Sequence, residues 1–390
     1  MTRLKTRWRL LAAVLGAGIL ASGAIAAVAA QVSSPVRLAP IATDQLIAST
    51  LRAIADGRPI SGHVSAHIDL GLPSLPTEGL PNIPGGAAQF LTSLNGNHSL
   101  RVWRSADGLR VSELLAMSER SLIVNRSAAW FWDFSSFTAY VVHRPHGAGN
   151  HPPLELADPL AIARHALESI TPTTAVSVGR TATVAGRPVY VLALEPRTAS
   201  TLVRRVEIDI DAAERLPLRV AVYARGRSAA PMSVSFTQVS FAPISRATYQ
   251  FSPPPGAKVR RIAPMSQGGG AGGSGYASGS ASYGTGTHGS GSATMPSIPA
   301  TKAPLRITHP LEQDPGAPTV FGSGWASVVA IRTPAMSELR MQMAGFDITQ
   351  FLPFSGPLFS IRLVDRGDHG WLLYGLVPQS ALAAVENRLH

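Results

Sequence analysis

Cysteine is absent from all 390 residues, and charged residues make up only 15% of the chain. Without cysteine, an exported protein has neither disulfides to brace it nor a thiol to carry a lipid anchor, so its stability must come from the core alone. Hydrophobic residues make up 45% of the chain, which is enough for a sizeable core, and the length allows two ordinary domains. The composition therefore indicates a folded protein rather than a disordered chain.

Lysine is also scarce, because only three of the 34 basic residues are lysines. Of the net charge of +11, four charges belong to Arg3, Lys5, Arg7 and Arg9 near the N-terminus. The remaining arginines are scattered and form no basic stripe with interleaved aromatic residues, so we predict no nucleic-acid partner. Scarce lysine with abundant alanine instead indicates the codon bias of a high-GC genome.

Residues 1–31 have the pattern of an export signal. A basic start is followed by an uncharged run from Leu10 to Ala30, which ends in small residues such as Ala27-Val28-Ala29. The run is about 20 residues long, enough to cross a bilayer, so a cleaved signal peptide and an uncleaved anchor are both open interpretations. In either case we expect the chain after Gln31 to lie outside the cytoplasm, secreted or held at the cytoplasmic membrane by residues 10–30.

Two amphipathic helices are predicted in the first large segment. The first covers Thr43 to Gly57, with Thr43 or Asp44 as its cap and Gly57 as its stop. The second opens at Asp158-Pro159 and reads "DPLAIARHALESI", with aspartate as the cap and proline at the first helical position.

Strands are predicted for most of the remaining sequence, because 36 glycines and 31 prolines together with many Val, Ser and Thr residues favour strands and turns. Asp107-Gly108 is the expected turn of a hairpin, and two or three strands follow in "RSLIVNRSAAWFWDFSSFTAYVV". A four-strand antiparallel meander, with one apolar and one solvated face, is predicted for "RPVYVLALEP", "LVRRVEIDID", "LPLRVAVYARG" and "MSVSFTQVSFA".

Two segments are predicted to lack regular structure, and a small unit follows the second. Gly71–Gly86 is too rich in proline for a sheet or a helix, and residues 263–304 form a Gly/Ser-rich flexible linker. Residues 305–390 then predict a small C-terminal α/β domain. Its parts are a strand in "GWASVVAI", a hairpin around Arg366-Gly367-Asp368 and a closing helix in "PQSALAAVENRL".

Catalytic motifs are missing from the sequence. There is no GxSxG elbow, HExxH motif or P-loop, and the "GTGTHG" match lies inside the Gly/Ser-rich linker, without the strand and helix that a dinucleotide site needs. We therefore predict that the protein is not an enzyme and has no cofactor.

Metal sites have two weak candidates. His143, His146 and His151 share one loop, and His63 and His67 share one face of a strand. With no cysteine and no carboxylate close by, a polar loop and a solvated strand face are the simpler interpretations, and we predict no metal.

The strongest positive signal is apolar. Trp130, Phe131, Trp132, Phe134 and Phe137 fall within eight positions, so aromatic side chains must lie on both faces of one strand. The segment "VYVLALE" is likewise apolar on both faces. An ordinary core and a ligand cavity use the same residues, so this pattern alone does not distinguish between them.

The succession of elements resembles the LolA/RseB family of exported lipoprotein carriers and lipid-sensing regulators. The resemblance covers roughly Thr43 to Ile262, assigned as a domain of residues 43–262, and it is carried by "SLRVWRSADGLRV", "RSLIVNRSAAWFWDF", "VYVLALEP", "VEIDIDAAERLPLRVAVY" and above all "YQFSPPPGAKV". It implies a mainly β (α+β) fold: an open, strongly curved antiparallel half-barrel with helices plugging its concave side. It also implies that "YQF" is the last strand and that the following prolines end it.

The C-terminal unit resembles the small second domain of RseB-type regulators, which LolA carriers lack. The long linker, the Gly71–Gly86 insertion, and Asn125-Arg126-Ser127 in place of an Asp-Gly turn depart from the family pattern.

The resemblance implies an exported, non-enzymatic protein that binds a lipid or the acyl chain of a lipoprotein in an apolar cavity. An RseB-like regulator that binds the extracytoplasmic part of a membrane anti-sigma factor is the alternative, and a cell-envelope hydrolase would need a serine or metal site that the sequence lacks. The residues predicted to line the cavity are Leu100, Val102, Trp130, Trp132, Phe134, Leu192, Leu194, Ile208, Val220, Val222 and Phe236.

Overall fold

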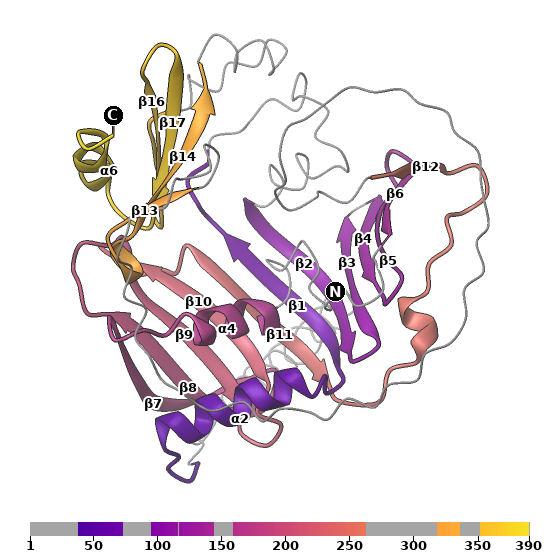
Figure 1. The fold of residues 1–390 in the computed structure, drawn as a ribbon. Coiled ribbons are helices and arrows are strands. Elements are labelled where there is room, and N and C mark those ends of the chain that lie inside the picture. Colours follow the sequence, from indigo (N-terminus) through magenta and orange to yellow (C-terminus); the bar gives the residue numbers. More distant parts are fainter. Residues whose placement is uncertain are drawn as a thin grey trace, which may run out of the picture.

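The structure, a computed structural model, describes residues 38–72, 95–115, 117–143, 159–262, 318–335 and 352–389. These residues form a 12-stranded sheet and a 5-stranded sheet, so the prediction of a mainly β fold is confirmed. Figure 1 shows that the two sheets are separate. The expectations for residues 1–31, for the linker at 263–304, for His146 and His151, and for most of Gly71–Gly86 lie outside the described residues. No helix in the described ranges is long and apolar enough to cross a membrane.

Two meanders build the large sheet. The first contains β1 to β6 and the second contains β7 to β11, and they join where β1 pairs with β11; the strand order is β12-β6-β5-β4-β3-β2-β1-β11-β10-β9-β8-β7. All pairs are antiparallel except β12 with β6, which makes the sheet mixed. The strands are β1 Ile60–Ile68, β2 Gly96–Ser105, β3 Gly108–Leu115, β4 Ser118–Val124, β5 Ala128–Asp133, β6 Thr138–His143, β7 Thr174–Val184, β8 Arg187–Pro196, β9 Val203–Asp211, β10 Pro217–Ala224, β11 Met232–Ser240 and β12 Lys258–Arg261.

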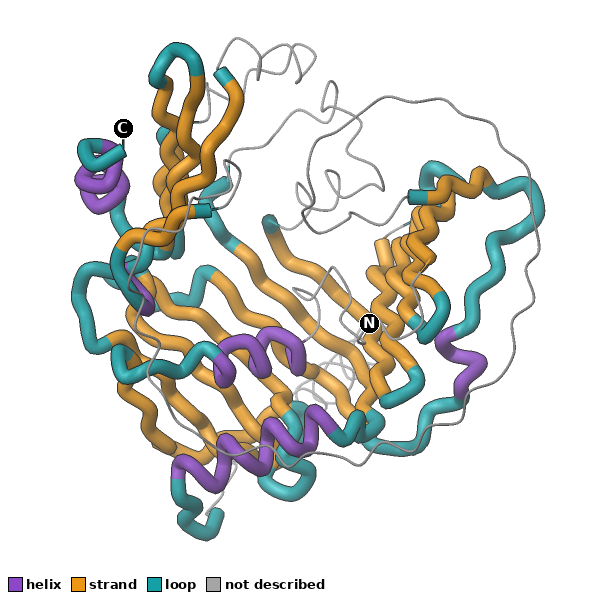
Figure 2. The backbone as a smooth tube through the Cα atoms, viewed as in Figure 1, coloured by secondary structure: helices purple, strands orange, loops and turns teal. Residues whose placement is uncertain are grey.

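Both predicted helices of this segment are present. They are α2 (Thr43–Ala55) and α4 (Pro159–Glu168), and they lie on the concave side of the sheet, in front of β7 to β11 (Figures 1 and 2). The predicted cap is wrong, because Ala42 occupies the N-cap position without a side-chain hydrogen bond. Gly57 ends α2 as predicted, with a positive φ of 62° that suits glycine. Asp158 lies outside the described residues.

The hairpins follow the sequence closely, with one omission. The turn between β2 and β3 is Ala106-Asp107, one position before the predicted Asp107-Gly108, because Ser105 pairs with Gly108. The aromatic-rich segment gives three strands, β4 to β6. The second meander has five strands instead of the predicted four. We missed β7 because it is an edge strand whose pairing with β8 shifts between Val178 and Thr181, which breaks the alternation of buried and exposed side chains.

The predicted last strand of the first domain, "YQF", is wrong. Residues Arg246–Tyr249 form a 3-10 helix, η2, and "QF" belongs to an irregular segment instead of a last strand. Tyr249 is held in this place because its ring is buried against Gly108, where a Cβ atom would lie 2.9 Å from the Tyr249 ring. The prolines do not release the chain, since β12 follows them and pairs with β6.

The second sheet contains β13 Thr319–Phe321, β14 Val328–Pro334, β15 Phe354–Ser355, β16 Ser360–Asp365 and β17 His369–Gly375, in the antiparallel order β13-β14-β17-β16-β15. The predicted hairpin and the closing helix, α6 (Gln379–Glu386), are confirmed. The "GWA" part of the predicted strand instead forms a 3-10 helix, η3 (Gly324–Ala326). Val328, Ala330, Val364 and Leu373 pack against Leu382 and Val385 of α6.

Hydrogen bonds join the two sheets. The Trp325 indole Nε1 donates to Thr174 Oγ1 (2.8 Å). The carbonyl oxygen of Leu376 accepts from Thr201 Oγ1 (2.6 Å) and from the backbone N–H of Leu202 (2.8 Å). The second sheet is therefore docked beside the start of β7 and the loop before β9, and Trp325 also packs into the apolar cluster under α2 and α4.

Candidate ligand-binding face

The strand register divides the large sheet into two faces. Directly paired residues share a face, so the pairs Val64–Leu100, Val64–Phe236 and Val220–Val234 trace one continuous side of the sheet. We call this side, which carries α2 and α4, the helix-bearing face, and the other side the opposite face.

Eight of the predicted cavity residues share the helix-bearing face: Leu100, Val102, Leu192, Leu194, Ile208, Val220, Val222 and Phe236. All are buried except Val222, which is half-buried. The side chains from β2 and β11 pack with Ala53 and Ile54 of α2, and those from β8 to β10 pack with Leu46 of α2. In this conformation the protein's own helices cover these positions, and their role as ligand contacts stays a prediction that requires a helix to move.

The other three predicted residues lie elsewhere. Trp130 and Trp132 pair with Ile123 and Ser121, which places both indoles on the opposite face. There Phe251 packs against both rings, with centroid distances of 5.4 Å to Trp130 and 5.9 Å to Trp132. Phe134 follows β5 in the hairpin turn, and 52% of its surface is exposed. The sequence alone could not show that the two tryptophans lie on the opposite face, because Phe251, which packs against them, is more than 100 positions away.

Sequence reasoning overlooked an aromatic pair on the helix-bearing face. Phe131 pairs with Leu122 and Tyr140, and Leu122 pairs with Val111, so both rings share a face with Val102. Their centroids are 6.2 Å apart, and both side chains are half-buried. The alternation of Trp130, Phe131 and Trp132 contained this signal, since Phe131 must point away from both tryptophans. These rings are more accessible to a ligand than the fully buried leucines of β8.

The opposite face of β9 and β10 carries buried charge. We predicted a solvated face here, and this is wrong for Glu207 and Asp209, which are each only 3% exposed. Arg219 contacts both carboxylates, with Nη1 3.1 Å from Asp209 Oδ2 and 3.5 Å from Glu207 Oε2. Arg205 adds a contact of 3.0 Å to Glu207. The arginine side chains extend over the carboxylates and exclude water from them, an arrangement that alternation cannot indicate.

The two carboxylates titrate in opposite directions. Burial raises the pKa of Asp209, and the attraction of Arg219 offsets this only in part. Burial also acts to raise the pKa of Glu207, but the hydrogen bond from Tyr223 and the charges of Arg205, Arg180 and Arg219 outweigh it, so its pKa is lowered. Glu207 is therefore a well-stabilised anion, whereas Asp209 carries its charge at a cost.

Asp211, on the same strand, has a structural role. Its Oδ1 atom accepts the backbone N–H groups of Ala213 (2.9 Å) and Glu214 (2.8 Å) in the turn between β9 and β10. Arg187 donates to both carboxylate oxygens. Burial acts to raise the pKa of Asp211, but the hydrogen bonds from Arg187 and from the turn outweigh it, so the pKa is lowered. This carboxylate fixes the hairpin.

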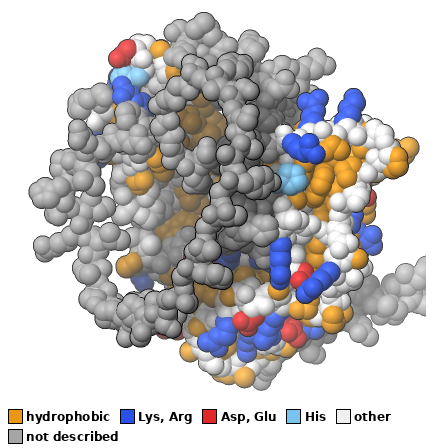
Figure 3. Space-filling model, turned by 45° about the vertical axis from the view of Figure 1, so that its right-hand side comes forward, with side chains coloured by type: hydrophobic (Ala, Val, Ile, Leu, Met, Phe, Trp, Pro, Cys, Tyr) orange, Lys and Arg blue, Asp and Glu red, His pale blue; other side chains and the backbone are white. Residues whose placement is uncertain are grey.

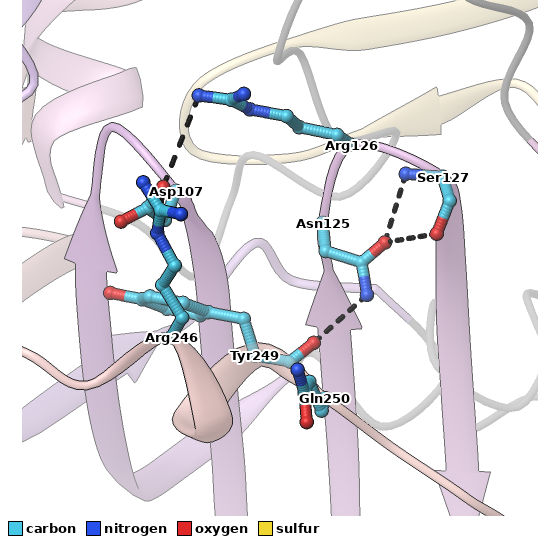
Figure 4. Close-up of a pocket in the computed structure, with 7 residues that line it drawn as sticks. All are labelled: Asp107, Asn125, Arg126, Ser127, Arg246, Tyr249 and Gln250. Atoms are coloured by element: carbon cyan, nitrogen blue, oxygen red, sulfur yellow. Dashed lines mark hydrogen bonds and ion pairs between the residues drawn. The ribbon is translucent and has the colours of Figure 1, made fainter.

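A polar pocket of about 310 Å³ lies where two hairpin turns meet η2 (Figure 4). Asp107 receives two guanidinium groups, Arg246 Nε at 3.1 Å and Arg126 Nη2 at 3.9 Å. The Asn125 side chain organises the turn, because its Oδ1 accepts the N–H groups of Ser127 and Ala128, each at 3.0 Å. Both arginines are largely exposed, so the ion pairs contribute little, and the polar lining does not suit an acyl chain.

Of the histidine candidates, the structure describes His63, His67 and His143. His67 Nδ1 lies 2.8 Å from Asn97 Oδ1, and His63 lies on the same face of β1. No group of three or more His, Cys, Asp or Glu side chains that could hold a metal ion occurs in the part of the chain that the structure describes.

Comparison with known proteins gives structural likeness without sequence likeness. No family model matches the sequence, and no curated protein matches it. The crystal structure of MucB superposes on 88% of this chain and 96% of its own, with 13% identity and a TM-score of 0.43. The complex of Pseudomonas aeruginosa MucA and MucB gives 14% identity with the same coverage and TM-score. A LolA superfamily protein from Nitrosomonas europaea matches over 54% of this chain and 99% of its own, with 8% identity and a TM-score of 0.23.

Proposed function

We propose that this protein is a non-catalytic extracytoplasmic regulator that binds a peptide segment, the extracytoplasmic part of a membrane anti-sigma factor. The observation that carries the proposal is the second sheet, docked on the large sheet, with an apolar face that its own helix leaves uncovered. The sequence resemblance to RseB-type regulators supplies the class of partner, because the carriers of that family lack this unit.

The uncovered face is made of six side chains of β14, β16 and β17, and Val320 of β13, which pairs with Val329, extends it. The pairs Val329–Tyr374, Ile331–Leu372, Ile361–Tyr374 and Leu363–Leu372 put them on one side of β14, β16 and β17. Five are half-buried and Tyr374 is exposed. Within the described residues α6 is the helix of this sheet, and it packs on the other side.

Binding at this face needs no covalent chemistry. Apolar side chains of a peptide would gain about 25 cal/mol for each Å² of apolar surface removed from water. A continuous apolar face on a rigid sheet therefore suits an extended or helical segment with regularly spaced apolar residues.

A substitution at the centre of the face tests the proposal. Tyr374→Arg places a charge among the six apolar side chains, and we expect it to weaken binding of the anti-sigma ectodomain by at least about tenfold, since one buried, unpaired charge costs more than 1.4 kcal/mol. Val259→Arg is the matched control, because Val259 is an exposed apolar residue of β12 in the large sheet and not in the second sheet. Isothermal titration calorimetry with the full chain measures both. Equal affinities of the two variants would contradict the proposal.

A lipid or lipoprotein acyl chain is the second candidate ligand, and the half-buried pair Phe131 and Tyr140 favours it. A chain lying against these rings would occupy the helix-bearing face where the side chains are still partly accessible. Native mass spectrometry of protein purified from its own membrane fraction should then show bound lipid, and Phe131→Arg should remove it. Protein that stays free of lipid under these conditions, and takes up no added fatty acid, would exclude this candidate while leaving the peptide proposal intact.

A further inference from the structure

Exposed apolar side chains are concentrated at one rim of the large sheet. The described residues leave nine large apolar side chains exposed, and three of these, Val320, Tyr374 and Leu376, belong to the second sheet. The other six form what we call the apolar rim: Leu114, Leu115, Met117, Phe134, Phe137 and Val259. The most exposed of them is Met117, at 91%. A cluster of this kind on an otherwise well-buried sheet marks an interaction surface.

The topology brings these residues together from three parts of the chain. Leu115 pairs with Ser118 at the tip of the β3–β4 hairpin. The next hairpin tip, between β5 and β6, lies beside it, because the backbone N–H of Phe134 donates to the carbonyl oxygen of Glu119 (3.0 Å). The start of β12 completes the rim, since the N–H of Lys258 donates to the carbonyl oxygen of Phe137 (3.0 Å).

The β5–β6 tip is built to hold its phenylalanines outward. The buried carboxylate of Asp133 accepts the N–H and the hydroxyl of Ser135 (3.0 and 2.6 Å) and the hydroxyl of Ser136 (3.0 Å). Phe137 has a φ of +49°, an uncommon conformation for a bulky residue. Its ring contacts Trp132 edge-on, with centroids 5.4 Å apart, and lies 6.4 Å from Phe134. The backbone strain at Phe137 accompanies the placement of two aromatic rings at the surface, and strain of this kind is often found at functional positions.

Positive charge borders the rim. Lys258, Arg260 and Arg261 of β12 are all exposed. Two acidic residues lie near the rim. Asp133 is buried among its serine partners, and Glu119 lies 3.9 Å from Arg110, so neither offsets the exposed positive charge of β12. Figure 3 shows this side of the molecule, where hydrophobic side chains gather next to Lys and Arg side chains.

We propose that the apolar rim inserts into the interfacial region of a membrane that contains anionic phospholipids. Leucine, methionine and phenylalanine side chains on hairpin tips can enter the headgroup boundary, while neighbouring lysine and arginine side chains bind lipid phosphates. A second copy of the chain is a poor occupant, because two rims would bring two basic β12 strands together. The proposal is independent of the peptide-binding function and adds an orientation: the β3–β4 and β5–β6 hairpin tips and the start of β12 face the bilayer.

The cysteine-free sequence makes the test direct, because a single introduced cysteine can carry a fluorescent probe. We would label the full chain at Met117→Cys or, as the matched control, at Val320→Cys, an exposed residue of the second sheet. Both proteins are mixed with vesicles of phosphatidylcholine alone or with phosphatidylglycerol added. Comparing two positions in the same chain separates rim insertion from membrane attachment through any other segment.

With phosphatidylglycerol vesicles, the probe at residue 117 should shift to shorter wavelength and be quenched by nitroxide-labelled lipid, whereas the probe at residue 320 should not respond. Leu115→Ser with Phe134→Ser should abolish the response at residue 117, while Tyr374→Ser with Leu376→Ser should leave it unchanged. Neutralising Lys258, Arg260 and Arg261 with serine should weaken insertion roughly 100-fold, because each cation near an anionic surface contributes about fivefold.

Three outcomes would overturn the proposal. They are equal responses at residues 117 and 320, no response at residue 117, and an equally strong response with phosphatidylcholine alone. A photoreactive group at residue 117 provides a second measurement in the native envelope. Crosslinking to a protein instead of lipid would show that the rim binds a protein and would also overturn the membrane proposal.

Discussion

The two halves of the large sheet use the same antiparallel strands in different ways. In the half from β7 to β11, both faces are closed: α2 and α4 cover the apolar side, and arginine side chains cover Glu207 and Asp209 on the other. In the half from β1 to β6 with β12, Phe251 packs against Trp130 and Trp132, Phe137 also contacts Trp132, and the hairpin tips leave apolar residues exposed. We infer that the half from β7 to β11 supplies stability and that the half from β1 to β6 with β12 is available for contacts.

The largest expected loss of stability comes from removing an arginine that covers the buried carboxylates of β9. Arg219→Met removes the cation that contacts both Glu207 and Asp209, and leaving a buried carboxylate without its partner should lower the free energy of unfolding by about 3–5 kcal/mol. Arg204→Met is the control, because Arg204 is exposed and should change stability by less than about 0.5 kcal/mol. Urea unfolding measures both. Adding Asp209→Asn to Arg219→Met should restore part of the loss, and no restoration would mean that the lost stability was packing instead of charge.

A pair of leucine substitutions compares the two halves directly. Leu192→Ala empties a fully buried site under the helices and should cost about 2–5 kcal/mol. Leu115→Ala, in the apolar rim, removes a side chain that is already exposed and should cost less than about 1 kcal/mol. Chemical denaturation with fluorescence detection gives both values. Similar losses of unfolding free energy for the two variants would mean that the β1–β6 half is as closed as the β7–β11 half, which would contradict the division of roles inferred above.

The smallest effect is a change of pH dependence within the closed half. Asp209 has a raised pKa, so the folded state holds its proton more tightly than the unfolded state, and its contribution falls as pH rises from the ordinary aspartate value through the raised one. Glu207 has a lowered pKa, so its contribution is present above the ordinary glutamate value and is lost as pH falls through the lowered one.

Urea unfolding of wild type, Asp209→Asn and Glu207→Gln between pH 7 and pH 4 measures these contributions. As pH falls, wild type should gain stability relative to Asp209→Asn and lose stability relative to Glu207→Gln. Differences of the same sign for both variants would show that the two carboxylates titrate as one group.

The sequence predicted local features well and long-range ones poorly. The β2–β3 hairpin, both helices of the large sheet and the hairpin of the second sheet depend on turn residues and periodicity within short segments, and all are present. The "YQF" segment was misassigned because its conformation depends on Gly108, more than 100 residues earlier. The position of β12 likewise depends on the open edge of β6.

The candidate site shows the same limit. Alternation correctly put Leu192 with Leu194, and Val220 with Val222, on one face of their strands, since period two is a property of a single strand. It could not show that Trp130 and Trp132 face the other way, because the relation between β5 and β8 is set by the register of every strand between them. Nor could it show which apolar residues stay exposed at the rim, because exposure depends on what the rest of the chain covers.

The junction of the two sheets has a consequence for the order of folding. Thr174 and Trp325 are 151 residues apart in the chain, and Thr201 and Leu376 are 175 apart. Contacts of such high contact order close large loops and gain little until the partners are already shaped, so meanders of local hairpins assemble first. We therefore expect the contacts between the two sheets to form after the local hairpins, as a junction between surfaces that are already shaped.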